Sequence, residues 1–160
     1  MNLKGTPILK YSRIKVGITF GDPAGIGPTI IAKALRRIGT IARFVVIGDK
    51  WVFKQALNPP LSNPANLNFI DLDNVPHKNF KFGKISAQYG QASIEYLDKA
   101  LELIKQKKID CLVTGPISKK AINLAGYSYS GHTEYLAKYL AKTKTESEVG
   151  MMLLNGELRF

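Results

Sequence analysis

The chain has 160 residues, 45% hydrophobic and 22% charged, the balance of a globular protein with one core or parts of two domains. No apolar run reaches the length of about 18 residues that a transmembrane helix needs, and the N-terminus lacks the apolar core of a secretory signal. We therefore expect a cytoplasmic protein. The single cysteine, Cys111, excludes an internal disulfide and lies in an apolar run, which predicts a buried, unreactive thiol.

The formal net charge of +11 fits a nucleic-acid partner, an anionic substrate or an ordinary lysine-rich surface. The basic residues are dispersed, and no segment interleaves them with aromatic residues as a groove for single strands does. We expect a solvated basic surface, with neither nucleic acid nor membrane as partner. A basic fragment that only binds a partner is the alternative outside the enzymes.

The first part of the chain has the pattern of a β-α-β unit. The short apolar runs Val16–Phe20 and Phe44–Ile47 are bounded by turn residues and predict buried strands. Between them, apolar residues at helical spacing predict a helix over Thr29–Ile38. A second short helix is expected after Gly48-Asp49, and the prolines and asparagines of residues 58–68 predict a surface loop.

The remaining elements continue the alternation of strands and helices. Strands are predicted over Phe69–Leu72, Lys84–Ala87, Asp110–Thr114, Val149–Leu154 and Glu157–Phe160, and helices over Gln91–Lys107, Ser118–Leu124 and Thr133–Ala141. The dipeptide Asn155-Gly156 between the last two strands is a strong hairpin signal.

This order of elements predicts an α/β fold with three layers, α/β/α, and a mostly parallel sheet, followed by a late antiparallel pair. We expect residues 1–126 to form the major part of a first domain and residues 127–160 to begin a second, incomplete one. The last predicted strand has no element after it to cover it. The chain is therefore expected to be a piece of a longer protein.

A glycine-rich turn, Gly21-Asp22-Pro23-Ala24-Gly25-Ile26-Gly27-Pro28, joins the first strand to the first helix. Its glycines let a ligand approach the main chain, and the amides at a helix start attract anions. The spacing is neither that of the Rossmann fingerprint nor that of a P-loop. A ligand-binding turn is the functional interpretation, and a tight connection between strand and helix is the structural one.

The same pattern recurs at a second strand end, Thr114-Gly115-Pro116-Ile117-Ser118-Lys119. Here Ser118 is suited to cap the next helix, and Lys119 to reach an anion near its start. A capped helix with solvated lysines explains the segment equally well.

A third segment, Gly131-His132-Thr133-Glu134, places an imidazole and a hydroxyl at the start of a predicted helix. A neutral imidazole can bond a substrate hydroxyl or phosphate oxygen, and Thr133 adds a further donor. Glu134 is expected to serve the positive end of the helix. His77 is expected on the surface, and no set of histidines and carboxylates has metal-ligand spacing.

Together with Ala125-Gly126, these three segments resemble the 4-hydroxythreonine-4-phosphate dehydrogenase family in order and spacing, from about Lys15 to Phe160. The resemblance implies two α/β domains like those of isocitrate and isopropylmalate dehydrogenases, with an active site in the cleft between them. It implies an enzyme of pyridoxal 5'-phosphate biosynthesis that oxidises and decarboxylates 4-hydroxythreonine 4-phosphate to 3-amino-2-oxopropyl phosphate. NAD or NADP is the implied oxidant, and a divalent metal held by three histidines from both subunits of a homodimer is the implied Lewis acid.

Residue by residue, His132 and Thr133 match the family's substrate-binding pair. Contacts of Asp22, Gly25, Gly27 and Lys119 with substrate or cofactor are hypotheses from the matching landmarks.

Two positions depart from the family's pattern, because Thr29 and Leu124 stand where the family has acidic residues. The metal-binding histidines match nothing in this chain, since the first would fall just past Phe160. We therefore expect residues 1–160 alone to be inactive. A related dehydrogenase of a phosphorylated four-carbon sugar acid is the alternative within the enzymes.

Overall fold

The computed structural model describes residues 14–38, 41–57, 66–140, 152, 154–155 and 158–159. In chain order its elements are β1 (Lys15–Thr19), α1 (Gly27–Ile38), β2 (Arg43–Gly48), α2 (Lys50–Ala56), β3 (Leu67–Asp71), α3 (Ala87–Lys105), β4 (Cys111–Thr114), α4 (Lys119–Leu124), α5 (His132–Leu140), β5 (Leu154–Asn155) and β6 (Leu158–Arg159).

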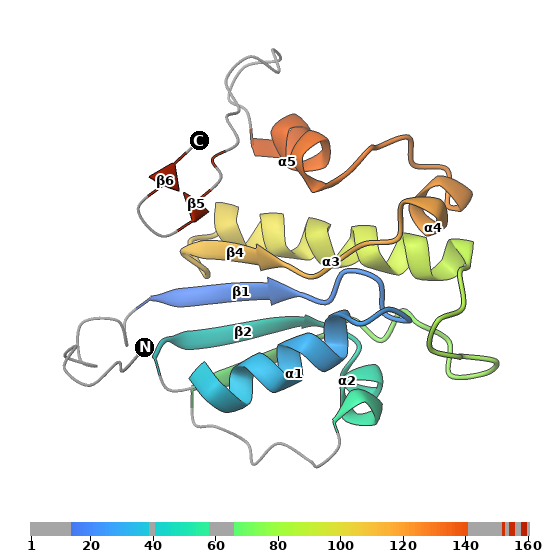
Figure 1. The fold of residues 1–160 in the computed structure, drawn as a ribbon, viewed down its shortest axis with the longest axis horizontal. Helices are drawn as coiled ribbons and strands as arrows, with labels where there is room; N and C mark the ends of the chain where they lie inside the picture. Colours follow the sequence, from blue (N-terminus) through green and yellow to red (C-terminus); the bar gives the residue numbers. More distant parts are fainter. Residues whose placement is uncertain are drawn as a thin grey trace.

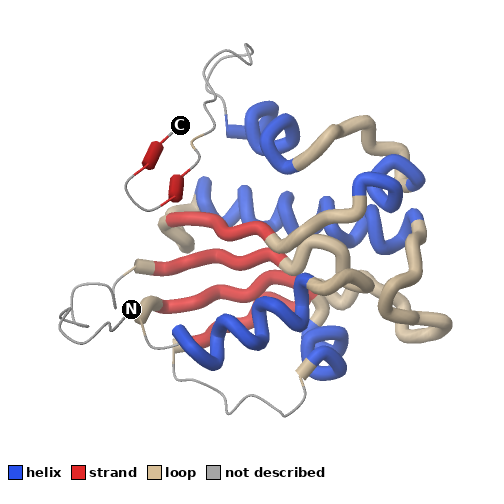
Figure 2. Tube along the Cα trace, in the orientation of Figure 1, coloured by secondary structure: helices blue, strands red, loops and turns tan. Residues whose placement is uncertain are grey.

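The first four strands form a parallel sheet in the order β3-β2-β1-β4. Helices α1 and α2 lie on one face and α3 lies on the other, so the sheet is the middle of three layers (Figures 1 and 2). Right-handed crossovers account for this arrangement, because the chain runs from β1 to β3 in one direction and then returns past β1 to β4. The predicted three-layer α/β/α class is confirmed.

The main core lies between the sheet and its helices. Phe20, which follows β1, is fully buried and stacks on Phe53 of α2 with ring centroids 5.5 Å apart. Its edge meets Tyr96 of α3 at 5.9 Å, so this ring joins the two helical layers at the end of the sheet. A second, smaller cluster holds α4 and α5 against α3; its buried members are Ile94, Leu97, Leu101, Ile122 and Tyr135.

Most predicted elements are present with boundaries shifted by a few residues. Ser118 caps α4 as predicted, because its Oγ accepts a hydrogen bond from the Ala121 amide at 3.2 Å. Residues 58–65 of the predicted loop lie outside the described residues, while Leu67 and Asn68 belong to β3.

The predicted strand over Lys84–Ala87 is wrong. Ser86 does have extended backbone angles, φ −151° and ψ 153°, but it is the residue before α3, and Ala87 is already helical. Nearby, the amide of Gly83 bonds the carbonyl oxygen of Ala24 at 2.7 Å, which attaches this segment to the glycine-rich turn. An extended pattern without a partner strand remains a loop.

The expectation of a buried Cys111 is also wrong, because the thiol is exposed. Cys111 lies in β4, which pairs with β1 on one side and is the edge strand of the four-stranded sheet. An apolar run on an edge strand is buried only where a helix covers its face.

The predicted antiparallel pair is present as β5 and β6, with Leu154 opposite Arg159 and Asn155 opposite Leu158. Val149 to Met151, Leu153, Gly156, Glu157 and Phe160 lie outside the described residues. The division into domains near residue 126 stays a prediction. In the described part of the chain, no helix is both long and apolar enough to cross a membrane.

Candidate functional site

Two loops meet at the carboxyl ends of β1 and β4. The amide of Asp22 in the glycine-rich turn donates to the carbonyl oxygen of Pro116 at 2.9 Å, and the amide of Gly115 donates to the carbonyl oxygen of Thr19 at 2.8 Å. The strands β1 and β4 are neighbours whose connections leave on opposite faces of the sheet (Figure 1). Such a switch point is where open α/β sheets bind ligands.

Three glycines, Gly21, Gly27 and Gly115, are required by the close approach of main-chain atoms where the two loops meet. A Cβ atom on Gly27 would lie 1.9 Å from the carbonyl oxygen of Phe20, and one on Gly115 would lie 2.2 Å from the same oxygen. Gly21 has φ +70°, and a Cβ there would lie 2.2 Å from the oxygen of Pro116. The tight-connection interpretation therefore accounts for these glycines, and Gly27 offers no open cradle to a ligand.

Asp22 is the buried acid of this turn, with 8% of its surface exposed. Its Oδ1 accepts a hydrogen bond from the Ala24 amide at 2.9 Å, which closes the turn. Burial raises the pKa of the Asp22 carboxyl, and the Ala24 bond opposes this rise. Gly25 follows at the half-buried rim, its amide bonded to the Asp22 carbonyl at 3.0 Å.

His132 reaches the same place from the first turn of α5. Its ring is half-buried and interacts with the backbone of Gly115, so the histidine lies beside the meeting point of the two loops. Its Nε2 is buried and has no hydrogen-bond partner among the described residues. Burial lowers the pKa of the imidazole, and the Gly115 backbone opposes this shift. The ring is consequently neutral near pH 7, with one donor and one acceptor nitrogen.

Three polar side chains near His132, those of Lys119, Thr133 and Glu134, lie at the surface. Thr133 and Lys119 are exposed. Glu134 accepts hydrogen bonds from the side chain and the amide of Ser130, and these bonds lower the pKa of its carboxyl, with a smaller contribution from the Lys119 charge. As predicted, Glu134 lies in the first turn of α5, where its negative charge is favourable at the positive end of the helix.

The structure therefore places the turn of Asp22, Gly25 and Gly27 against the Gly115-Pro116 loop, and the Gly115 backbone also interacts with His132. It leaves Lys119 and Thr133 exposed. His77 lies on the surface as expected and stacks on Trp51 with ring centroids 4.2 Å apart. Over the described ranges, no three histidine, cysteine or acidic side chains are close enough to hold a metal ion.

A buried acid that the sequence interpretation missed follows β2. Asp49 is fully buried; its Oδ1 accepts from the Val75 amide at 3.0 Å, and its Oδ2 accepts from the hydroxyl of Tyr96. Burial is the main cause that raises the pKa of this carboxyl. The sequence feature that could have identified Asp49 is its position directly after a predicted strand of a parallel sheet. These bonds attach both the segment that follows β3 and helix α3 to the residue that follows β2, beside the site.

The fold is that of an α/β protein, and this meeting of loops is its candidate ligand site, at a topological switch point. A family model described as pyridoxal phosphate biosynthetic protein PdxA matches residues 40–160, and the chain belongs to that family. It is 36% identical to the D-threonate 4-phosphate dehydrogenase of Cupriavidus necator, over 90% of this chain and 47% of that protein.

Two solved structures share the fold. One is a 4-hydroxythreonine-4-phosphate dehydrogenase from Burkholderia phymatum, with a TM-score of 0.74 and 30% identity over 92% of this chain and 48% of that one. The other is a terephthalate 1,2-cis-dihydrodiol dehydrogenase from Burkholderia xenovorans, with a TM-score of 0.74 and 27% identity over 92% of this chain and 46% of that one. The chain spans about half the length of these relatives.

Proposed function

We propose that this chain is the half of a nicotinamide-dependent dehydrogenase that contains the switch point between β1 and β4. The proposed substrate is a four-carbon hydroxy acid phosphorylated at C4. The observation that carries the proposal is the half-buried His132, whose Nε2 lacks a partner among the described residues at the meeting point of the two loops. An unpaired buried nitrogen is costly unless a ligand satisfies it. A substrate hydroxyl or phosphate oxygen is such a ligand.

D-threonate 4-phosphate is the first candidate substrate, because the Cupriavidus necator relative carries that name. The second is 4-hydroxythreonine 4-phosphate, the substrate in the name of the Burkholderia phymatum structure. The two molecules share the carboxylate, the C3 hydroxyl and the phosphate, and they differ at C2, which carries a hydroxyl in one and an ammonium group in the other. Discrimination between them therefore depends on groups that face C2.

The proposed reaction removes a hydride from C3 to NAD or NADP and a proton from the C3 hydroxyl. The resulting 3-oxo acid loses its carboxylate as carbon dioxide, the electron pair of the broken bond passes into the enolate, and C2 then takes up one proton to give the ketone. D-threonate 4-phosphate would thus give 3-hydroxy-2-oxopropyl phosphate, and 4-hydroxythreonine 4-phosphate would give 3-amino-2-oxopropyl phosphate.

The residues of this chain would bind and orient the substrate. A neutral His132 would hydrogen-bond a substrate oxygen, the Thr133 hydroxyl would add a donor, and the exposed ammonium of Lys119 would attract the phosphate. The described residues do not fit a metal ion, and backbone atoms already fill the space beside Gly27. We assign the metal ligands and the cofactor cradle to polypeptide beyond the described residues.

The test is a titration of the chain by nuclear magnetic resonance. D-threonate 4-phosphate is expected to shift the His132 ring signals and to leave those of the surface residue His77 unchanged. D-threonate without phosphate is the matched control and should bind more weakly. If no ligand of the panel, including 4-hydroxythreonine 4-phosphate, moves the His132 signals at millimolar concentration, the proposed binding site is wrong.

A further inference from the structure

A cavity of about 520 Å³ lies at the amino ends of the parallel strands, at the opposite end of the sheet from the switch point. Its volume is that of an ordinary small-molecule site. Its lining includes three cationic and three apolar residues, which are Lys15, Arg43, Lys108, Val45, Ile70 and Leu103. Lys15 begins β1 and Thr19 ends it, so roughly 13 Å of strand separates this rim from the loops at the carboxyl ends.

The strand register places the cavity on the face of the sheet that α3 covers. Lys15 is the partner of Arg43, so the two side chains lie on the same face. On this face, a Cβ atom on Gly17 would lie 2.4 Å from Cδ1 of Ile109, a buried residue that follows α3. Helix α3 contacts β1 and β2, whereas β3 is the edge strand of the sheet. The cavity therefore lies beside the last turn of α3, over the β2–β3 side of the sheet.

The end of α3 holds Lys108 at the rim of the cavity. Lys107 has a left-handed backbone with φ +56°, and its amide donates to the carbonyl oxygen of Ile104 at 2.9 Å. The next amide, that of Lys108, donates to the carbonyl oxygen of Leu103 at 2.8 Å. These two bonds form a Schellman motif, in which the position of Lys108 frequently carries an apolar residue. Here that position carries a cation, and it lines the cavity together with Leu103.

The three cations of the rim are not paired with acids. In the described part of the chain, no carboxylate lies within 4 Å of their charged groups, and no acid lines the cavity. Glu102 is paired with Lys99 at 2.7 Å, and Asp110 accepts a hydrogen bond from the main-chain amide of Lys15 at 2.8 Å. Unneutralised charges of one sign around a concave surface attract ligands of the opposite sign.

We propose that this cavity binds a small organic anion, a molecule with an apolar body about the size of one aromatic ring and a phosphate or carboxylate group. The anionic group would lie among the three cations, where Arg43 can offer two parallel N–H donors to its oxygens. The apolar body would lie against Leu103, which is buried, and against the half-buried Val45 and Ile70. The site shares no residue with the proposed substrate site.

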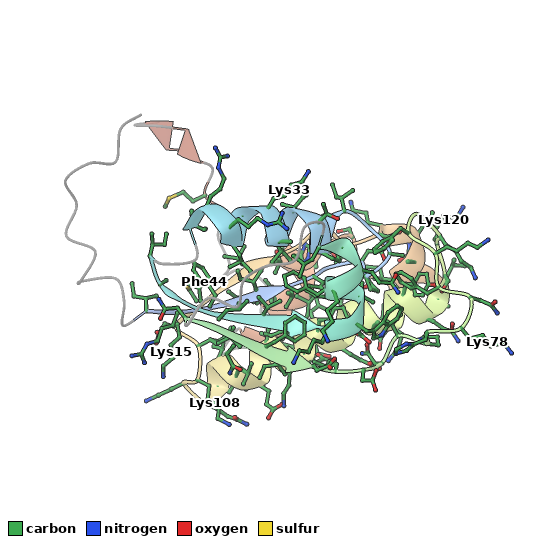
Figure 3. The ribbon with its side chains drawn as sticks, turned by 90° about the horizontal axis from the view of Figure 1, so that it is seen from below. Lys15, Lys33, Phe44, Lys78, Lys108 and Lys120 are labelled. Carbon is green, nitrogen blue, oxygen red and sulfur yellow. The ribbon has the colours of Figure 1, made fainter. Side chains whose placement is uncertain are left out.

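A small anion suits this cavity better than a polymeric one. Nucleic acids are bound by a continuous basic patch or stripe. Figure 3 shows Lys15 and Lys108 at one end of the molecule, while Lys33, Lys78 and Lys120 lie on other sides of it. The positive charge around the cavity is therefore local.

The experiment titrates the isotope-labelled chain with phenyl phosphate at low ionic strength and follows its amide signals by nuclear magnetic resonance. The signals of Asn68 and Lys108, which both line the cavity, are expected to shift with a dissociation constant of about 1 mM or lower. Inorganic phosphate supplies the anion alone and phenol the ring alone. Each should bind at least about tenfold more weakly, because each lacks half of the contacts. Added salt should weaken the binding of phenyl phosphate, since it screens the rim charges.

Substitutions at the rim identify the cations that bind the probe. Arg43→Gln and Lys108→Gln should each raise the dissociation constant by about fivefold, because each removes one charge and keeps a polar side chain. Lys33→Gln is the matched control, since it removes the same charge from an exposed position of α1 on another side of the molecule, and it should change the constant by less than about twofold. Circular dichroism verifies the fold of each variant.

Four results would overturn the proposal. The first is that the Asn68 and Lys108 signals stay fixed in about 10 mM phenyl phosphate, and the second is equally tight binding of inorganic phosphate or phenol. The third is an equal loss of binding in Lys33→Gln, which would reduce the effect to nonspecific charge attraction. The fourth is a set of shifts confined to His132, which would place the probe at the switch point. If D-threonate 4-phosphate left the His132 signals unchanged, that result would count against the proposed function and leave the result for this cavity standing.

Discussion

Gly27 and Gly115 pack against one atom, the carbonyl oxygen of Phe20, from two loops that are far apart in the sequence. Added Cβ atoms would lie 1.9 Å and 2.2 Å from that oxygen. The oxygen belongs to rigid backbone at the end of β1, so it cannot yield as a flexible side chain does. The switch point is consequently closed by contact between main chains.

Gly27→Ala is expected to lower the free energy of unfolding by about 1–3 kcal/mol, the usual cost of overpacking. Urea denaturation of the chain measures it. Gly131→Ala is the matched control, because a Cβ atom there meets nothing within 4 Å, and its effect should stay within about 0.5 kcal/mol. Equal losses in the two variants would contradict the close approach.

His132 should titrate below the ordinary histidine value of 6.5, because burial disfavours the charged ring. Between the lowered folded-state pKa and 6.5, the unfolded chain therefore binds more protons at this residue than the folded chain does. The free energy of unfolding consequently falls as the pH drops through this window. Resonance titration of the two histidines measures the midpoint directly, with His77→Ala for assignment. His132→Gln should reduce the pH dependence of stability in this window. A midpoint above 6.5 would show that the ring is not desolvated.

Tyr96→Phe should destabilise the chain by about 1–3 kcal/mol, because Oδ2 of the buried Asp49 loses the hydroxyl that donates to it. Tyr127→Phe serves as control: its hydroxyl donates to Gln91 at 3.0 Å in an exposed position, where water replaces the bond. Urea denaturation compares the two variants. If Tyr96→Phe lowered the free energy of unfolding no more than Tyr127→Phe, the bond between Tyr96 and Asp49 would not stabilise this end of the sheet.

Purified residues 1–160 should produce no NADH or NADPH above background when mixed with D-threonate 4-phosphate or 4-hydroxythreonine 4-phosphate, a divalent metal and either cofactor. The reason is that the described residues hold no group of three metal-ligating side chains, and backbone atoms fill the space beside Gly27. Absorbance at the reduced nicotinamide band provides the readout. The Cupriavidus necator enzyme under identical conditions is the positive control, and turnover by residues 1–160 would contradict the assignment of the metal ligands and the cofactor cradle to other polypeptide.

Much of the fold could be predicted from local patterns. The apolar runs gave β1, β2 and β4, the helical stripe gave α3, and the spacing around Ser118 gave the cap of α4, because each depends on residues that are neighbours in sequence. The sequence also showed the order of the three candidate segments, which are the glycine-rich turn, Thr114–Lys119 and Gly131–Glu134. The false strand at Lys84–Ala87 shows the limit of such patterns, since an extended segment becomes a strand only when another strand lies beside it.

The sequence by itself determined the alternation of strands and helices, the candidate residues and the family resemblance, because periodicity and motif order are local properties. Only the tertiary structure decided which residues meet: His132 with the backbone of Gly115, Asp49 with Tyr96, and the Cys111 thiol with solvent. These outcomes follow from strand order and from which helix covers which face. Both are set by the packing of the whole chain, which no short stretch of sequence encodes.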